Sequence, residues 1–213
     1  MTELRLRLLG VPEVRLGDQP VALRRRTSVA LLGYLATTGR RSPRSMLTGL
    51  LAGDASEAQA QKRVSNTLTE LRAAVGGHLQ VTPEWVAFDR ERPHWIDVSE
   101  FEAQVAAREE PRAAAAGAAA ALDLYRGEFL DGVDLSDAAG LDEWLVVQRE
   151  RLRLALIRAL QAALKGHLRS GPTAASGGGS MPSSSASTRR YAAYCFSAAP
   201  RWPLRASSTI RAW

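Results

Sequence analysis

The stretch AQKRVSNTLTELRAAVGG, from Ala60 to Gly77, predicts an amphipathic helix that ends at a pair of glycines. At about 100° per residue, one side of this helix is mostly apolar and is expected to face a core. That side consists of Ala60, Val64, Thr67, Leu68, Leu71 and Val75. The opposite side carries Lys62, Ser65, Asn66, Thr69 and Ala73, flanked by Arg63 and Glu70 and by Gln61 and Arg72. A helix that faces only water commonly carries Glu and Lys in mixed pairs, so this composition raises the question of what the outer side contacts.

Short strands are predicted on both sides of this helix. Residues 4–10, LRLRLLG, alternate Leu with Arg, and residues 12–23 hold two apolar runs around a Gly17-Asp18 turn, which predicts three short antiparallel strands. After the helix, residues 78–89 hold two short apolar runs joined through Thr82-Pro83-Glu84, which indicates a hairpin.

Two more helices are expected between the first strands and the 60–77 helix. RRTSVALLGYLATTG, at residues 25–39, has helical spacing and a closing glycine. SPRSMLTGLLAG follows, with Ser42 as a predicted N-cap and Pro43 at the first helical position. Ser56 and Gln59 then form a capping box at the start of the third helix. Three helices followed by a β-hairpin indicate a winged helix.

A second, helical unit is expected to begin near Ser99, which forms another capping box with Glu102. Three helices follow, and the last is long, with leucines near heptad positions, so the unit resembles a tetratricopeptide-like bundle. After it, the chain is rich in Ser, Gly and Pro. The predicted fold class is mostly α with small β: a winged helix-turn-helix domain over residues 1–97, a helical domain over residues 98–168, and a disordered tail over residues 169–213.

The charge of the chain is divided unevenly along its length. The net formal charge is +6, but residues 1–98 carry +4, residues 99–150 carry −8, and residues 151–213 carry +10 with no acidic residue at all. A basic first unit, an acidic second unit and a basic tail are expected to meet different partners. The lack of acids in the tail favours the hypothesis that it is translated out of frame.

Several classes of protein are disfavoured by the sequence. A single cysteine and three scattered histidines give no zinc spacing, so no metal is expected, and a reducing, cytoplasmic location fits best. No signal peptide is recognised, no apolar run approaches the ~18 residues of a membrane helix, and no phosphate-binding glycine loop is present. Because no nucleophile, base and orienting group are clustered, we expect neither an enzyme nor a cofactor.

The outer side of the 60–77 helix has the composition of a surface that enters a major groove. Lys and Arg can neutralise phosphates or bind guanine, Asn can bridge the N6 and N7 of adenine, and Ser and Thr contact DNA without bulk. In helix-turn-helix geometry, the preceding helix crosses the backbone. The predicted contacts to double-stranded DNA are Lys62, Arg63, Ser65, Asn66, Thr69, Arg72, Arg24, Arg25, Arg26 and Arg44. The alternative is an ordinary solvated helix with a solvated arginine run before the first helix.

The same residues carry a family resemblance. LRLRLLGVPEVRLGDQPVAL, RRRTSVALLGYLATTGRRSPRSMLTGLL and RVSNTLTELRAAVGG resemble the OmpR-type winged helix of the antibiotic-regulatory-protein (SARP) activators. WIDVSEFE, ALDLYRGEFLDGV and LDEWLVVQRERLRLALIRAL resemble the bacterial transcriptional activator domain that follows it in that family. The resemblance covers roughly residues 4–164. It implies a regulator that binds direct repeats near promoters and helps to recruit RNA polymerase, with the acidic unit as a surface for a homodimer or another partner.

The sequence also departs from the family pattern. Ser65, Asn66 and Glu70 stand where the family often has Arg, which is expected to weaken phosphate affinity and to change the bases recognised. Two hypotheses therefore remain from the sequence. One is a DNA-binding activator. The other is a truncated DNA-binding or dimerising protein that competes with intact regulators without activating transcription.

Overall fold

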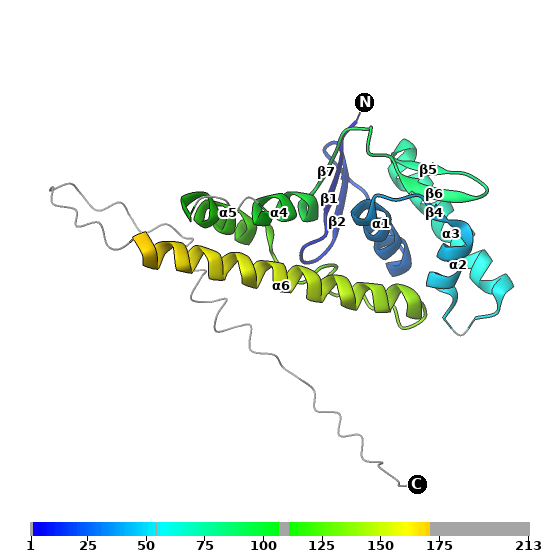
Figure 1. Ribbon diagram of the computed structural model, residues 1–213. Coiled ribbons are helices and arrows are strands. Elements are labelled where there is room, and N and C mark those ends of the chain that lie inside the picture. Colours follow the sequence, from blue (N-terminus) through cyan, green and yellow to red (C-terminus); the bar gives the residue numbers. More distant parts are fainter. Residues whose placement is uncertain (1, 54, 107–110, 171–213) are drawn as a thin grey trace, which may run out of the picture. The chain divides into compact units, whose positions relative to one another are not determined.

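The structure is a computed structural model that describes residues 2–53, 55–106 and 111–170, and all of these residues fall within one compact unit. The strands are β1 (Leu4–Arg7), β2 (Glu13–Leu16), β3 (Gln19–Pro20), β4 (Ser42–Pro43), β5 (Leu79–Val81), β6 (Trp85–Phe88) and β7 (His94–Ile96). The helices are α1 (Arg26–Thr38), α2 (Arg44–Ala52), α3 (Glu57–Val75), the 3₁₀ turn η1 (Gly76–His78), α4 (Asp97–Ala106), α5 (Pro111–Leu124) and α6 (Ala139–Ser170). Figure 1 shows their arrangement. The fold is mostly α with small sheets, as predicted, whereas most of the tail predicted for residues 169–213 lies outside the described residues.

The first sheet has the strand order β3-β2-β1-β7. Strands β1, β2 and β3 are antiparallel, as predicted, and the turn between β2 and β3 contains Gly17 at a φ of 60°. Strand β7 adds to the other side of β1 in parallel, with Leu6 opposite Ile96. Its three residues form no periodic run, so the sequence did not predict it.

The second sheet has the order β4-β6-β5 and contains the predicted hairpin of β5 and β6. Here the predicted start of the second helix is wrong. Ser42 is buried and pairs with Val86 in strand β4, and α2 begins only at Arg44. The local capping signal is overridden because β4 completes the sheet beside β6.

Helix α3 confirms the predicted division between an inner and an outer side. Its buried residues are Ala60, Val64, Thr67, Leu68, Leu71 and Val75. The side chain of Gln59 accepts a hydrogen bond from the backbone N–H of Ser56 at 3.3 Å, which is one half of the predicted capping box. The helix ends at Gly76, whose φ of 55° suits a glycine.

The helical part begins two residues before the predicted Ser99 cap, because Asp97 starts α4. Asp97 is buried, and its carboxylate accepts hydrogen bonds from the backbone N–H groups of Leu8 and Leu9 at 2.8 to 2.9 Å. Burial raises the pKa of Asp97, although these hydrogen bonds and the Arg126 guanidinium act in the opposite direction. The carboxylate thus ties the end of β1 to the start of α4.

Helix α6 follows α4 and α5 and contacts both of them, and its first turn also reaches α2. At Gly140, an added Cβ would lie 3.1 Å from the Cα of Leu50, so the two backbones approach closely. Trp144, one turn further on, packs edge-on against the rings of Tyr34 in α1 and Phe129. None of the helices in the described part of the chain is both long and apolar enough to cross a bilayer.

The Asp97 contact predicts a large effect of substitution. We expect Asp97→Ala to lower the free energy of unfolding by about 2 to 4 kcal/mol, because two buried N–H groups lose their acceptor. Urea denaturation at neutral pH measures the change. The control is Asp123→Ala, an exposed aspartate of α5, which should stay within ~0.5 kcal/mol of the parent chain. Equal small effects of both changes would contradict the role of Asp97.

Candidate nucleic-acid interface

The outer side of α3 is open to solvent. Lys62, Ser65, Asn66, Thr69 and Arg72 are all exposed. Thr69 donates its hydroxyl hydrogen to the Ser65 carbonyl at 2.8 Å, within the helix. Within the described ranges, the side chains of Lys62, Asn66 and Arg72 form no hydrogen bond or ion pair. These three side chains are therefore available to a ligand.

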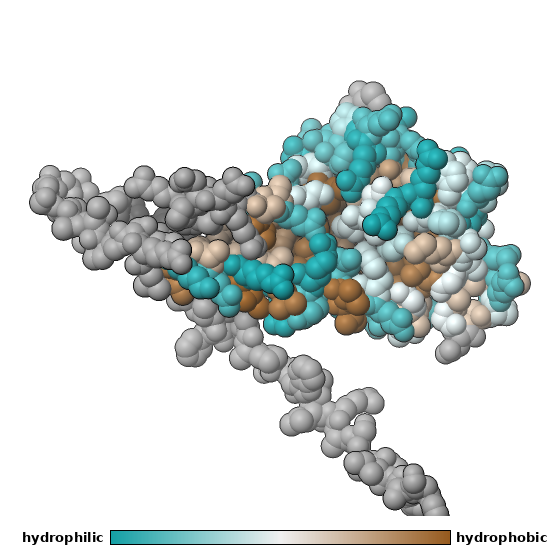
Figure 2. Space-filling view, viewed as in Figure 1, coloured by the Kyte–Doolittle hydropathy of each residue, from teal (hydrophilic) through white to brown (hydrophobic). Residues whose placement is uncertain are grey.

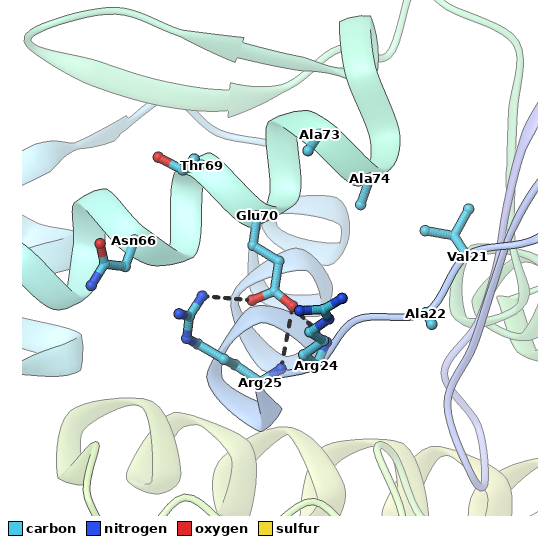
Figure 3. A pocket seen from close by; sticks show the side chains of 9 residues that line it. All are labelled: Val21, Ala22, Arg24, Arg25, Asn66, Thr69, Glu70, Ala73 and Ala74. Atoms are coloured by element: carbon cyan, nitrogen blue, oxygen red, sulfur yellow. Dashed lines mark hydrogen bonds and ion pairs between the residues drawn. The ribbon is translucent and has the colours of Figure 1, made fainter.

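Glu70, on the flank of the same helix, points to the segment before α1 (Figure 3). Its carboxylate accepts hydrogen bonds from the Arg24 backbone N–H at 2.5 Å, the Ser28 hydroxyl at 2.7 Å and the Arg25 guanidinium at 3.0 Å. The Glu70 side chain is only 14% exposed. Burial acts to raise the pKa of Glu70, but the hydrogen bonds from Ser28, Arg24 and Arg25 outweigh it and hold this pKa below 4.5.

This geometry changes the interpretation of Glu70 given by the sequence. The acid does not stand among the outward side chains in place of an arginine. It fastens α3 to the start of α1, because it accepts hydrogen bonds from the Arg24 backbone N–H just before that helix and from the Ser28 hydroxyl in its first turn.

A shallow hollow of about 580 Å³ lies beside this contact (Figure 3). It is lined by Val21, Ala22, Arg24, Arg25, Asn66, Thr69, Glu70, Ala73 and Ala74. Four small apolar side chains thus combine with two arginines, with the Glu70 carboxylate and with two polar outward residues of α3, Asn66 and Thr69. The structure brings four of the predicted contact residues together at this hollow: Arg24, Arg25, Asn66 and Thr69.

A second hollow lies at the other end of the outer side, between α2, α3 and the β5–β6 turn. It is lined by Arg44, Ser45, Thr48, Glu57, Gln61, Val64, Ser65 and Pro83. The guanidinium of Arg44 reaches the Thr82 carbonyl at 3.5 Å, so this arginine lies near the hairpin turn. Two more predicted residues, Arg44 and Ser65, are thereby placed together.

Two of the arginines predicted to contact DNA, Arg63 and Arg26, direct their side chains toward the acidic loop before α6. Arg63 donates a hydrogen bond to the Asp137 carbonyl at 2.7 Å, and Arg26 lies 3.8 Å from the Asp134 carboxylate. The Arg26 pair is two-thirds exposed on both sides and is therefore weak. Arg63 helps to hold the loop against the side of α3.

Two tertiary contacts of this region were not predicted from the sequence. The loop around Asp137 lies beside α3, although 74 residues separate it from Arg63 along the chain. The guanidinium of Arg41 lies 4.5 Å from the centre of the Trp85 ring, on the second sheet. Neither contact has a local sequence signal, because each joins segments that only the tertiary fold brings together. No group of His, Cys, Asp and Glu side chains that could hold a metal ion occurs among the described residues.

An open, polar third helix followed by a β-hairpin, next to a helical unit, is the arrangement of a winged helix joined to a helical domain. Residues 96–177 match the family model of the bacterial transcriptional activator domain. Comparison with curated protein sequences gave no match. The chain therefore carries a bacterial transcriptional activator domain, which is the domain that the resemblance to SARP-type regulators predicted for this part of the sequence.

Among solved structures, the chain is similar to Mycobacterium tuberculosis EmbR, which was determined in complex with a low-affinity phosphopeptide. The TM-score is 0.55 and the sequence identity 22%, so the likeness is one of fold. The match covers 77% of this chain and 46% of the EmbR chain. The chain thus spans less than half the length of that protein.

The Glu70 contact predicts a pH-dependent effect. Because the pKa of Glu70 is lowered in the folded chain, its contribution to stability is present above pH 4.5 and is lost as the pH falls through the lowered value. We expect Glu70→Gln to lower the free energy of unfolding by about 2 kcal/mol at pH 7. The difference from the parent chain should shrink in acid. Denaturant unfolding at several pH values measures it, with the exposed Glu84→Gln as control. A constant difference at every pH would contradict an ionised Glu70 as the acceptor.

Proposed function

We propose that the chain is a sequence-specific regulator of transcription that places α3 in the major groove of double-stranded DNA. One observation carries this proposal: the outer side of α3 exposes Lys62, Asn66 and Arg72 without partners among the described residues. On a helix about 10 Å wide, the Asn66 amide matches the donor and acceptor pattern of the groove, and the cations Lys62 and Arg72 can neutralise the phosphates that border it. Ser65 and Thr69 lie between them without the bulk that would hold the helix away from the bases.

The two hollows beside α3 are proposed to receive the sugar-phosphate backbone. Arg24 and Arg25 border the first hollow and Arg44 borders the second, so cations stand on both sides of the helix. Arg25 keeps its ion pair with Glu70, which leaves part of its guanidinium free to donate to a phosphate. Arg63 and Arg26 are expected to contribute less to phosphate binding, because their guanidinium groups already contact the loop before α6.

The domain organisation follows from this role. We assign residues 1–97 to a DNA-binding domain and residues 98–168 to the bacterial transcriptional activator domain, with residues 169–213 as a tail. In this proposal the protein acts in the cytoplasm, binds direct repeats near promoters, forms a homodimer on DNA and contacts RNA polymerase through the acidic helical domain.

The alternative is a regulator that occupies the same sites without activating transcription, and such a protein would bind DNA equally well. A promoter–reporter assay separates the two, because only an activator raises transcription.

Two substitutions on α3 are expected to act differently. Asn66→Ala should relax the preference at one base position, at a cost of about 1 to 3 kcal/mol on the preferred sequence. Arg72→Ala should weaken binding to every sequence by a similar factor and reduce the slope of log K against log salt by about 0.9. Selection of bound fragments from random duplexes, followed by titrations at several salt concentrations, measures both effects.

Arg15→Ala on strand β2 is the matched control for Arg72→Ala, because Arg15 is exposed and lies on the first sheet. It should leave affinity, salt slope and base preference as they are. If Asn66→Ala and Arg72→Ala changed binding to all sequences equally, α3 would not recognise bases. If neither substitution changed binding, DNA would lie on another surface.

A further inference from the structure

The β5–β6 hairpin, which follows α3, carries no cation of its own. Residues 79–88 contain neither Lys nor Arg, and the exposed Glu84 lies in the turn. The turn nevertheless borders the outer side of α3, because Pro83 and Ser65 line the same hollow. Figure 2 shows hydrophilic surface where this hairpin projects in Figure 1. A cation that serves this end of the interface therefore has to come from another segment.

The segment that leads into β4 and α2 supplies three arginines, Arg40, Arg41 and Arg44, and none of them forms an ion pair within the described ranges. Arg41 differs from the other two, because its guanidinium lies 4.5 Å from the centre of the Trp85 ring. The register of the sheet explains this contact. Pro43 pairs with Trp85, and side chains two residues apart on a strand point to the same face. Arg41 therefore lies diagonally across from the ring.

The ring that holds Arg41 is itself well fixed. The Thr82 hydroxyl accepts a hydrogen bond from the Trp85 backbone N–H at 3.0 Å, and the Thr82 N–H donates to the Trp85 carbonyl at 2.9 Å. The Trp85 side chain is half-buried against the sheet. An exposed contact between a cation and an aromatic ring stabilises a fold only slightly, but it restricts where the cation can lie. The ring thus orients Arg41 more than it stabilises the protein.

Arg41 is also exposed, and its guanidinium donates no hydrogen bond to any of the residues that the structure describes. Other arginines of this surface spend their donors on the protein. Arg25 pairs with Glu70, and Arg63 donates to the Asp137 carbonyl. An arginine that is held in place while its N–H donors stay free is suited to a planar, bidentate contact with a phosphate.

We propose that Arg41, oriented by Trp85, binds a phosphate of the DNA backbone beside the groove that receives α3. This role rests on the proposed function and extends the DNA contact to the hairpin. The hollow on this side is lined by one cation and one acid, Arg44 and Glu57, so it offers little net positive charge. Trp85 is two residues from Pro83 of that hollow, a step of about 7 Å along a strand. Arg41 thus adds the positive charge that the hairpin side otherwise lacks.

Titration of the full chain with a mixed-sequence duplex and with a duplex obtained by selection, at several salt concentrations, tests the role of Arg41. Arg41→Ala should weaken binding to both duplexes by roughly 10-fold and reduce the slope of log K against log salt by about 0.9, because one phosphate contact is lost. Arg40→Ala is the matched control. It removes the same charge from the neighbouring exposed residue, which no ring holds, and should have the smaller effect on both quantities.

A double-mutant cycle tests the part of Trp85. Trp85→Leu should weaken binding in the parent chain and should have no effect in the Arg41→Ala chain, since the ring then holds no cation. Trp85→Phe keeps an aromatic face and should bind DNA nearly as the parent chain does. Circular dichroism and thermal unfolding check that each variant is folded.

Equal effects of Arg40→Ala and Arg41→Ala would overturn the proposal, because long-range charge would then explain both. So would an Arg41→Ala chain that binds like the parent, or a Trp85→Leu effect that persists without Arg41. The α3 variants Asn66→Ala and Arg72→Ala separate these results from a failure of the proposed function. If they act as expected and Arg41→Ala does not, only the role of Arg41 fails. If none of the substitutions changes binding, DNA lies on another surface and both proposals fail.

Discussion

The burial of one side of α3 is the constraint on which the rest of the interface depends. Six inward residues fix the rotation of the helix about its axis, and thereby fix which residues face solvent. Glu70 then fastens one flank to the start of α1, and Arg63 holds the other part of the helix to the loop before α6. Because both contacts use one flank of the helix and not the centre of its outer side, that side remains exposed. A rigid helix that presents short polar side chains needs little reordering when it meets a ligand.

Specific contacts connect the two parts of the described chain. Asp97 joins the first sheet to α4, and the first turn of α6 packs closely on α2 at Gly140. These contacts place the acidic loop around Asp137 next to the helix that is proposed to enter DNA.

The inner side of α3, the β5–β6 hairpin and the long α6 could be predicted from the sequence, because each depends on local periodicity or on a turn. The outer residues of α3 could be predicted as exposed for the same reason. Ser42 and Ser99 misled the prediction of helix starts, since β4 pairing and the Asp97 contact with Leu8 and Leu9 outweigh a local cap. The role of Glu70 could not be foreseen either. Its partners lie more than 40 residues away, and only the packing of α1 on α3 brings them within hydrogen-bond distance.

The central claim is that the exposed side of α3 lies against base edges, and photo-crosslinking tests it most directly. A photoreactive group would be attached to Thr69→Cys, with the chain's single cysteine replaced by Cys195→Ser, and compared with the same group at Val11→Cys. On a duplex obtained by selection, the group at position 69 should crosslink to bases of the bound site, and the group at position 11 should not. Crosslinks from position 11 with none from position 69 would contradict the account.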